Sequence, residues 1–170
     1  MIISLIGYMG SGKSTTGQDL AKTLGYEFID LDNYIEDKYE LSVSEIFEKF
    51  GELGFRKREK EALHEVLHKT NIVLSLGGGT PVYYDNMDVI NQNSLSFYLR
   101  LPVFFLAKRL ENKKDKRPLI AHLNNEDLTE FVAKHLFERN PYYNKAHHII
   151  SITSQSPSEV LNEIMIKIKN

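Results

Sequence analysis

The chain opens with Met1-Ile-Ile-Ser-Leu-Ile6 and continues with Gly7-Tyr-Met-Gly-Ser-Gly12-Lys13-Ser14. The first segment is a short apolar run that ends in glycine, which is typical of a buried strand. A helix is expected from about Ser14 to Leu24. The second segment matches G-x-x-x-x-G-K-[ST] between a strand and a helix, the setting in which this pattern forms a phosphate-binding loop, or P-loop. A chance match in a chain of this length has a probability on the order of one in a hundred, given glycine at about 7% of residues.

Each residue type in this loop has a physical reason. The glycines let successive backbone N–H groups point at phosphate oxygens, and the helix that follows adds its positive N-terminal end. Lys13 supplies a positive charge to the β- and γ-phosphates, and the hydroxyl of Ser14 can bind Mg²⁺. We therefore predict ATP and Mg²⁺ as cofactors. The residues predicted to contact them in the loop are Gly10, Ser11, Gly12, Lys13, Ser14 and Thr15.

Strands and helices are predicted to alternate along the rest of the chain. Four more apolar segments favour strands, at residues 27–30, 71–76, 95–99 and 148–152. Helices are expected at 42–50, 55–69, 102–109 and 126–139 and after residue 156, two of them starting at capping boxes. This alternation predicts a three-layer α/β/α fold with a five-stranded parallel sheet, in which ligands bind beyond the carboxyl ends of the strands.

The domain organisation follows from composition along the chain. The sequence has no internal repeat, low-complexity tract or linker, so residues 1–170 are predicted to form a single domain. Between about residues 111 and 125 the helical pattern dissolves into charged and turn-forming residues around Arg117. We expect this segment to be a mobile lid.

Overall composition excludes several classes of protein. The 170 residues include 21 Lys and Arg, 23 Asp and Glu and no cysteine. A near-neutral balance gives no electrostatic footprint for nucleic acid or an anionic membrane. The lack of cysteine excludes disulfides and thiol nucleophiles. Because no segment has a signal-peptide pattern or about 20 apolar residues in a row, we expect a cytoplasmic enzyme without a membrane partner. We also expect no nucleic-acid partner and a monomer.

Two aspartates make phosphoryl transfer the favoured reaction. Asp30 and Asp32 end the predicted second strand two residues apart, hence on one side of the pleat. One carboxylate could hold Mg²⁺ through water, while the other accepts a hydrogen bond from a substrate hydroxyl and orients it for attack. Alternatively, one of them caps a helix that begins near Asn33.

A lid arginine would fit the same reaction. Arg117 could neutralise charge on the transferring phosphoryl group, an effect worth about 10³–10⁵ in rate for arginine fingers. The neighbouring lysines leave open the alternative of an ordinary solvated loop.

Six segments together resemble the shikimate kinase family, over essentially the whole length of the chain. They follow that family's order and spacing: the P-loop with its aromatic second residue, Asp30-Leu-Asp32, Phe55-Arg56-Lys-Arg-Glu59, Gly77-Gly78-Gly79, Arg117-Pro118-Leu119 and Arg139-Asn-Pro-Tyr-Tyr143. Singly the later segments are weak signals, but six in this order are specific. One departure is Leu76, where the family usually has Thr; another is the shorter stretch after Tyr143.

The resemblance implies a P-loop kinase fold and a role for each matching residue. Such an enzyme would transfer the γ-phosphoryl group of ATP to the 3-hydroxyl of shikimate, in the biosynthesis of chorismate and aromatic amino acids. Asp32 would bind ring hydroxyls and activate the attacking one, and Gly77, Gly78 and Gly79 would let the backbone approach the ring. Arg56 and Arg139 would bind the carboxylate of shikimate, and Arg117 would face the phosphates. Ser14 would bind Mg²⁺, with Asp30 placed behind it. The residues expected to pack around the adenine are Arg109, Gln155 and Pro157.

The basic residues have plainer alternatives. Arg56 could belong to a solvated helix face together with Arg58, and Arg139 could simply favour a helix C-terminus. Guanidinium groups do suit a planar carboxylate, which they bind with two parallel hydrogen bonds. The six histidines show no metal-binding pattern and are predicted to be structural or solvated.

Two other functions stay open. The first is another small-molecule P-loop kinase, such as a gluconate kinase or a nucleoside monophosphate kinase. The second is a non-catalytic module that binds nucleotide or shikimate, against which the set Lys13, Ser14, Asp32 and Arg117 argues.

Overall fold

The computed structural model of the protein describes residues 1–112 and 120–169. These residues contain a five-stranded sheet with strand order β2-β3-β1-β4-β5, in which all neighbouring strands are parallel. The strands are β1 (Ile2–Ile6), β2 (Glu27–Asp30), β3 (Ile72–Ser75), β4 (Leu95–Arg100) and β5 (His148–Ser151). The predicted sheet is therefore confirmed, and each strand end lies within one residue of its prediction.

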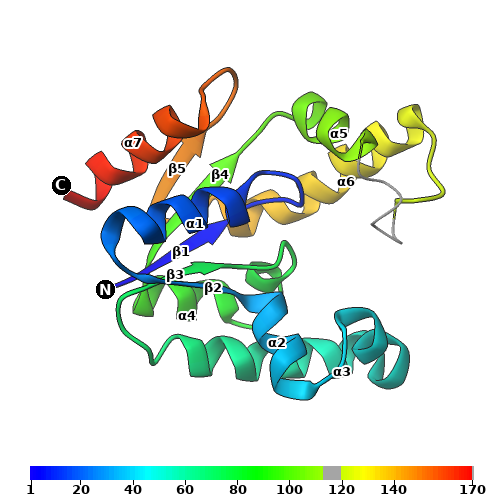
Figure 1. Ribbon diagram of the computed structural model, residues 1–170. Helices are drawn as coiled ribbons and strands as arrows, with labels where there is room; N and C mark the ends of the chain where they lie inside the picture. The colour runs from blue at the N-terminus through cyan, green and yellow to red at the C-terminus, as the bar shows by residue number, and fades with distance from the viewer. Residues whose placement is uncertain (113–119, 170) are drawn as a thin grey trace.

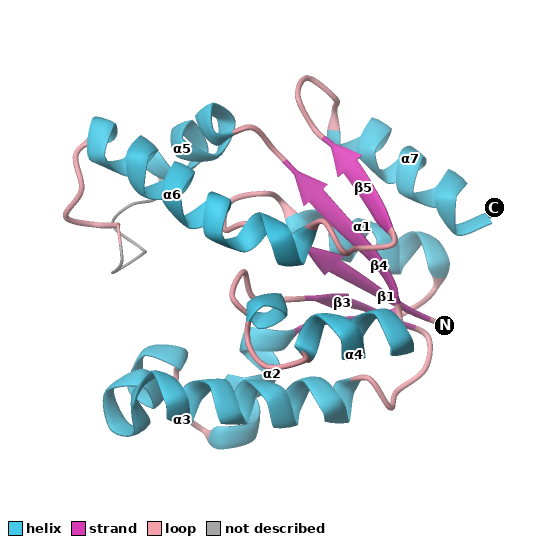
Figure 2. Cartoon of the chain, turned by 180° about the vertical axis from the view of Figure 1, so that it is seen from behind, coloured by secondary structure: helices cyan, strands magenta, loops and turns pink. Residues whose placement is uncertain are grey.

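Helices cover both faces of the sheet (Figures 1 and 2). One face carries α1 (Lys13–Leu24) and α7 (Pro157–Lys169), and the other carries α4 (Asn86–Asn93) and α6 (Asn125–Tyr143). The remaining helices are α2 (Leu31–Tyr39) and α3 (Val43–Val66), which lie together beside β2, and α5 (Val103–Glu111), which packs against α6. The three-layer α/β/α prediction is confirmed.

Strands β1 and β3 lie in the interior of the sheet, and this position explains why their sequences are almost continuously apolar. All residues of β1 and β3 are buried, because layers on both sides exclude water from the middle of the sheet. Ser4 in β1 is buried as well, and its Oγ lies 2.7 Å from Oγ of Ser94. In the part of the chain that the structure describes, no helix has the length and apolar character of a membrane span.

Helix starts were predicted better than helix ends. Both capping boxes form, at Ser42 with Glu45 and at Ser156 with Glu159. The two helices predicted at 42–50 and from Phe55 are joined in α3 across a kink at Gly51, whose φ of 68° and ψ of −179° are not helical. Pro102 is the N-cap of α5 rather than part of its first turn.

The predicted end of α6 at Arg139 is wrong, because the helix continues through Pro141 to Tyr143. Tyr143 is fully buried and its hydroxyl donates to the carbonyl of Gly78 at 2.5 Å. This anchoring holds the last turn in place although proline supplies no N–H to it.

One helix and a helical turn were not predicted. They are α4 and the 3₁₀ turn η1 (Thr80–Val82), which follow the glycine triplet. Asparagine-rich α4 has weak intrinsic helix propensity, and it is held by the burial of Met87 and Ile90 against the sheet. The predicted lid is described only at its two ends, since residues 113–119 lie outside the described part of the chain.

Gly17 seats α1 on the sheet behind the P-loop. A Cβ at this position would lie 2.5 Å from a ring carbon of Phe28 in β2 and 3.3 Å from Cδ1 of Leu5 in β1. The missing side chain therefore lets α1 approach the sheet closely, and this approach places the start of the helix at the strand ends.

We expect Gly17→Ala to lower the free energy of unfolding by about 1–3 kcal/mol, because crowding in a packed contact outweighs alanine's better helix propensity. Chemical denaturation followed by circular dichroism measures the change. The control is Gln18→Ala on the exposed side of α1, which is expected to be neutral or slightly stabilising. A gain in stability for Gly17→Ala would contradict the packing argument.

Candidate functional site

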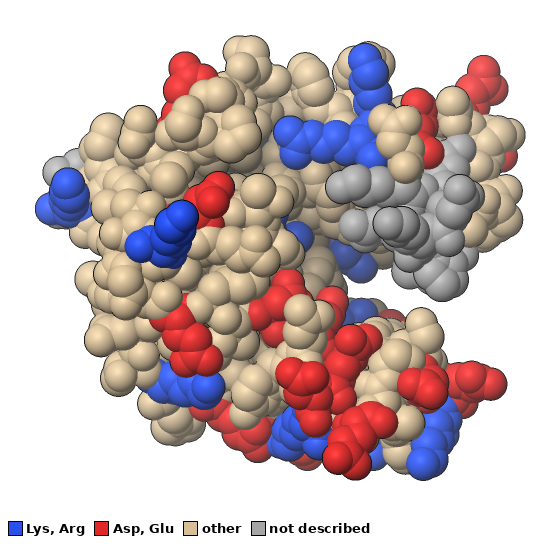
Figure 3. All heavy atoms as spheres, viewed as in Figure 1, with Lys and Arg blue, Asp and Glu red and all other residues tan. Residues whose placement is uncertain are grey.

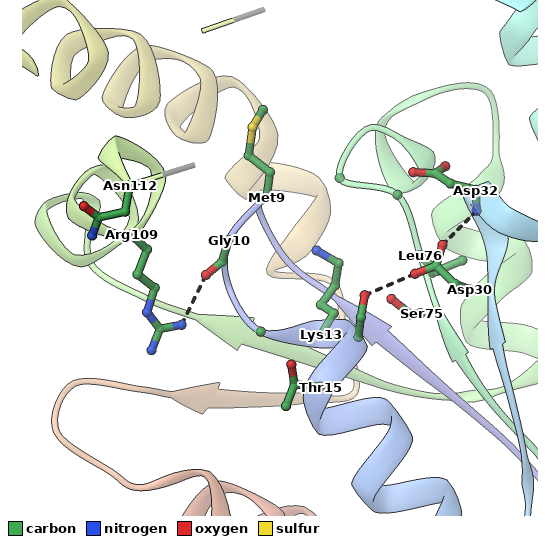
Figure 4. A pocket seen from close by; sticks show the side chains of 14 residues that line it. Met9, Gly10, Lys13, Thr15, Asp30, Asp32, Ser75, Leu76, Arg109 and Asn112 are labelled. Atoms are coloured by element: carbon green, nitrogen blue, oxygen red, sulfur yellow. Dashed lines mark hydrogen bonds between the residues drawn. The ribbon is translucent and has the colours of Figure 1, made fainter. Parts of the chain in front are cut away.

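A cleft of about 590 Å³ opens at the carboxyl ends of β1, β2 and β3. It is lined by Met9, Gly10, Gly12, Lys13, Ser14, Thr15, Asp30, Asp32, Ser75, Leu76, Gly77, Gly78, Arg109 and Asn112. Figure 4 shows these side chains, with Arg109 and Asn112 on one side and Asp30 and Asp32 on the other. In Figure 3 the molecule is hollowed between the surface formed by α2 and α3, where acidic side chains gather, and the surface near α5.

The predicted phosphate-binding loop has the backbone that its glycines permit. Gly10 has φ of 80°, and Gly12, the N-cap of α1, has φ of 93°, both in the left-handed region that favours glycine. The ammonium group of Lys13 donates to the carbonyl of Gly7 at 2.7 Å and to that of Tyr8 at 3.0 Å. A positive charge and the N-terminus of α1 therefore meet in the cleft, as an anion requires.

Arg109 reaches the same loop from α5. Its Nη1 donates to the carbonyl of Gly10 at 3.1 Å, and a Cβ on Gly12 would lie 3.8 Å from that nitrogen. Arg109 thus lies over the outer side of the loop, on the side of the cleft away from the two aspartates (Figure 4).

The capping alternative is confirmed for Asp30, and its role at Mg²⁺ stays a prediction. It is the N-cap of α2, because its Oδ1 accepts from the backbone N–H groups of Asp32 and Asn33. Its Oδ2 accepts from the hydroxyl of Ser14 at 3.2 Å. This pair of oxygens, one hydroxyl and one carboxylate, suits Mg²⁺, which prefers oxygen ligands and keeps several of its waters.

Asp32 lies in α2, so its predicted position at the end of the strand is wrong. The chain turns into the helix directly after Asp30, and the pleat argument does not apply. Asp32 still faces the cleft, because it occupies the first turn of a helix that starts at the edge of the sheet. A Cβ on Gly77 would lie 3.1 Å from its Oδ1.

The surroundings of Asp32 disfavour its charged form. Burial is the main cause, the negative charges of Asp30 and Glu59 add to it, and the positive charge of Lys13 opposes it. Together they raise the pKa of Asp32 to about 6. The carboxylate is therefore a stronger proton acceptor than an aspartate in water.

The glycine triplet after β3 brings the predicted acceptor-binding residues together. A Cβ on Gly78 would lie 2.8 Å from Nη1 of Arg139, and one on Gly79 would lie 2.6 Å from Nη2 of Arg56. Each glycine thus leaves the space that one functional side chain occupies. Gly77 and Gly78 line the cleft, whereas the predicted site residues Gly79, Arg56 and Arg139 are not part of its lining.

Glu59 is a residue whose role the sequence reasoning missed. It is almost completely buried, and its two oxygens accept from Nη1 of Arg56 and from Oγ1 of Thr80, each at 2.8 Å. A signal was present in the sequence, since Glu59 follows Arg56 by three positions on the helix face that carries Ala62 and Leu63 into the core.

The structure places Arg56 rather than Arg58 at the glycine triplet. The guanidinium of Arg58 lies 3.7 Å from the ring centroid of Phe50, and its Nη1 donates to the carbonyl of Gly54. The two arginines are about 200° apart around the helix, so they face opposite ways.

Several predicted residues are not brought to the cleft. Ser11 is part of the loop but buried. Gln155 and Pro157 do not line the cleft, and the Gln155 side chain caps its own turn by accepting from the N–H groups of Thr153 and Ser154. Arg117 lies outside the described residues. The roles of these residues stay predictions.

The histidines that make described contacts have structural partners. Nδ1 of His135 lies 3.0 Å from the hydroxyl of Tyr8, and that of His147 lies 3.0 Å from the hydroxyl of Ser96. Within residues 1–112 and 120–169, no three His, Cys, Asp or Glu side chains form a group that could hold a metal ion.

A parallel sheet with a P-loop after its central strand, in a cleft that also holds two aspartates and part of a glycine triplet, defines a small P-loop phosphotransferase. Comparisons with known proteins name the family. The shikimate kinase family model matches residues 9–169. The shikimate kinase of Flavobacterium johnsoniae is 44% identical over 165 residues, which are 96% of each chain.

Solved structures agree with this relationship. A shikimate kinase from Bacteroides thetaiotaomicron matches with a TM-score of 0.94 and 34% identity, covering 100% of this chain and 99% of the other. One from Acinetobacter baumannii, in complex with shikimate, matches at 0.88 and 35%, covering 99% and 92%. The chain belongs to the shikimate kinase family. The predicted class, a P-loop kinase that uses ATP and Mg²⁺ to phosphorylate shikimate, is confirmed at the level of the family.

The raised pKa of Asp32 has a consequence for stability. Because the folded protein holds this proton more tightly than the unfolded chain, stability falls as the pH rises from about 4 to about 6. Above that range the buried charge of Asp32 lowers the free energy of unfolding by a constant amount. We therefore expect Asp32→Asn to stabilise the metal-free protein by about 1–2 kcal/mol at pH 7.5 and hardly at pH 4.

Urea unfolding in a chelator, followed by circular dichroism because the chain has no tryptophan, measures this difference at each pH. The matched control is Asp37→Asn on the exposed side of α2, whose effect should stay near zero throughout. A stabilisation by Asp32→Asn that is equal at both pH values would contradict the electrostatic explanation.

Proposed function

We propose that the cleft transfers the γ-phosphoryl group of ATP directly to the 3-hydroxyl of shikimate, with no covalent enzyme intermediate. One observation carries the assignment of residues. Three successive glycines place Asp32, Arg139 and Arg56 side by side, and two of these glycines line the same cleft as Lys13. A small acidic ring held at the triplet would therefore present a hydroxyl toward the phosphate-binding loop.

The acceptor's carboxylate is assigned to Arg56 and Arg139. Guanidinium groups bind a planar carboxylate with two parallel hydrogen bonds, and these two groups fill the space that Gly78 and Gly79 leave beside the cleft. Glu59 orients Arg56 through its bond to Nη1. Gly77 and Gly78 line the cleft without side chains of their own, so the ring can approach their backbone.

The acceptor's hydroxyl is assigned to Asp32. Its carboxylate accepts the hydroxyl hydrogen bond, which aligns the oxygen with the phosphoryl group, and takes up the proton as the new bond forms. The raised pKa of about 6 brings its basicity closer to the operating pH.

The phosphates are assigned to the P-loop and Lys13, the metal to Ser14 with Asp30 behind it, and the adenine side to Arg109. Mg²⁺ bound with ATP supplies charge neutralisation on the phosphate oxygens. Lys13 adds a positive charge at the mouth of the loop, where two carbonyls already hold it. The contribution of Arg117 from the lid belongs to the same proposal, as do adenine contacts of Gln155 and Pro157.

The substrate assignment is tested by a coupled assay of ADP release with shikimate, gluconate and nucleoside monophosphates as acceptors. We expect turnover with shikimate and at least about 100-fold lower kcat/KM with the others, because neither offers a rigid acidic ring for two guanidinium groups. Calorimetric titration with shikimate separates binding from transfer. Turnover of gluconate or a nucleotide in preference to shikimate would overturn the assignment.

Arg139→Ala tests the carboxylate clamp. Loss of a charge-assisted hydrogen-bond partner should raise the KM for shikimate about 10- to 100-fold. The KM for ATP should change by less than about twofold, because the loop residues are untouched. Arg58→Ala is the control from the opposite face of α3, and it should leave both constants near those of the parent protein. If Arg58→Ala raised the KM for shikimate more than Arg139→Ala does, the assignment would be contradicted.

A further inference from the structure

The guanidinium group of Arg56 is held on three sides. Its Nη1 donates to Glu59, Gly79 lies against its two terminal nitrogens, and the ring centroid of Tyr83 lies 4.0 Å from its Cζ. Only 10% of the Arg56 side chain is exposed. The ring of Tyr83 therefore covers one flat face of the group, in the geometry of a cation–π contact.

The Nε edge of the same group has no such partner. Nε of Arg56 is buried, and no hydrogen bond joins it to the described residues. The neighbouring carboxylate is Glu52, one helical turn earlier, whose Oε1 is 3.9 Å from Nε, too far for a hydrogen bond. A buried guanidinium N–H without an acceptor is costly, and a ligand carboxylate would relieve that cost.

Tyr83 also controls where Glu52 points. Its hydroxyl donates to Oε1 of Glu52 at 2.5 Å, and this is the same oxygen that faces Nε of Arg56. Glu52 and Arg56 have i, i+4 spacing on α3, at which glutamate and arginine readily form an ion pair. The Glu52 side chain is 58% exposed and its Oε1 already lies at ion-pair distance from Nε, so the bond to Tyr83 is the described contact that opposes a closer approach.

We propose that Tyr83 is a positioning residue for shikimate: its ring fixes the plane of the Arg56 guanidinium, and its hydroxyl keeps the carboxylate of Glu52 off Nε. Nε then keeps no hydrogen-bond acceptor among the described residues, and the carboxylate of the acceptor would supply one. This inference rests on the proposed role of Arg56 in binding that carboxylate.

Two physical effects give Tyr83 this role. An arginine side chain has several rotatable bonds, and stacking on a half-buried ring removes part of the entropy that binding would otherwise lose. Glu52 and Arg56 form a long ion pair at 3.9 Å, which leaves Nε without a hydrogen-bond acceptor, and only a closer Glu52 that accepted from Nε would compete with the substrate for this donor. The bond to Glu52 also raises the pKa of Tyr83, so its hydroxyl remains a donor at neutral pH.

The two effects are separated by two substitutions at Tyr83. Tyr83→Phe keeps the ring and releases Glu52, and we expect it to lower kcat/KM for shikimate about threefold. Tyr83→Leu also removes the ring, and we expect a loss of about tenfold. In both variants the kcat at saturating shikimate and the KM for ATP should stay within about twofold, because the phosphate-binding loop is not involved.

Two further comparisons give readouts that a merely structural role would not change. Glu52→Gln, added to Tyr83→Phe, removes the competing charge and should restore kcat/KM for shikimate to within about 1.5-fold of the parent. The methyl ester of shikimate lacks the carboxylate charge, so neither substitution should change kcat/KM for the ester by more than about twofold. Tyr84→Leu is the matched control, because Tyr84 is half exposed and its ring lies near Lys60 rather than Arg56.

The inference is overturned if either Tyr83 variant lowers kcat/KM equally for shikimate and its ester, or if Glu52→Gln does not restore Tyr83→Phe. It is also overturned if Tyr83→Phe behaves like the parent protein. If Tyr83→Leu does not fold, Tyr83→Phe and the double variant still decide. Arg56→Lys and Arg139→Ala, measured in the same assay, distinguish a failure of the Tyr83 inference from a failure of the proposed function. If both variants leave the KM for shikimate unchanged, the proposed function itself fails.

Discussion

The parallel pairing of β1 with β3 and of β3 with β2 is the constraint on which the site depends. Parallel strands end at the same edge, so the P-loop, the aspartate pair and the glycine triplet emerge side by side although more than 60 residues separate the first from the last. The close seating of α1 at Gly17 then holds the helix N-terminus at that edge. No contact between the three segments themselves is needed to bring them together.

The glycines at this edge of the sheet shape the site as much as the charged groups do, because they leave room for other side chains. The space over Gly78 and Gly79 is taken by the guanidinium groups of Arg139 and Arg56, which come from helices on different sides of the cleft. The loop is braced from below by Tyr143 on the carbonyl of Gly78 and by Asn86 on that of Thr80. A rigid glycine loop with fixed arginines is a preorganised surface, which lowers the ordering cost of binding a small acceptor.

The electrostatics of the cleft are arranged at a cost to stability. Asp32 is buried near Asp30 and Glu59, so its charge is unfavourable in the folded protein. A structural carboxylate in this position would be expected to have more partners than Asp32 has. A carboxylate whose charge is disfavoured in this way is typical of functional sites.

The sequence predicted local features of the structure well and features that depend on long-range contacts poorly. The strands, the P-loop and the capping boxes follow from short patterns, because hydrophobic periodicity and turn chemistry are properties of neighbouring residues. The choice of Arg56 over Arg58 rested on the family resemblance. The weak helix α4, the extension of α6 through Pro141 and the placement of Asp32 in α2 were missed, because burial and distant anchors override local propensity there. By itself the sequence thus determined the order of elements and the phosphate-binding loop. Only the tertiary structure decided the contacts around Arg56. Glu59 bonds to Thr80 and Tyr83 bonds to Glu52, and these pairs are 21 and 31 positions apart in the sequence, so no local pattern could predict them.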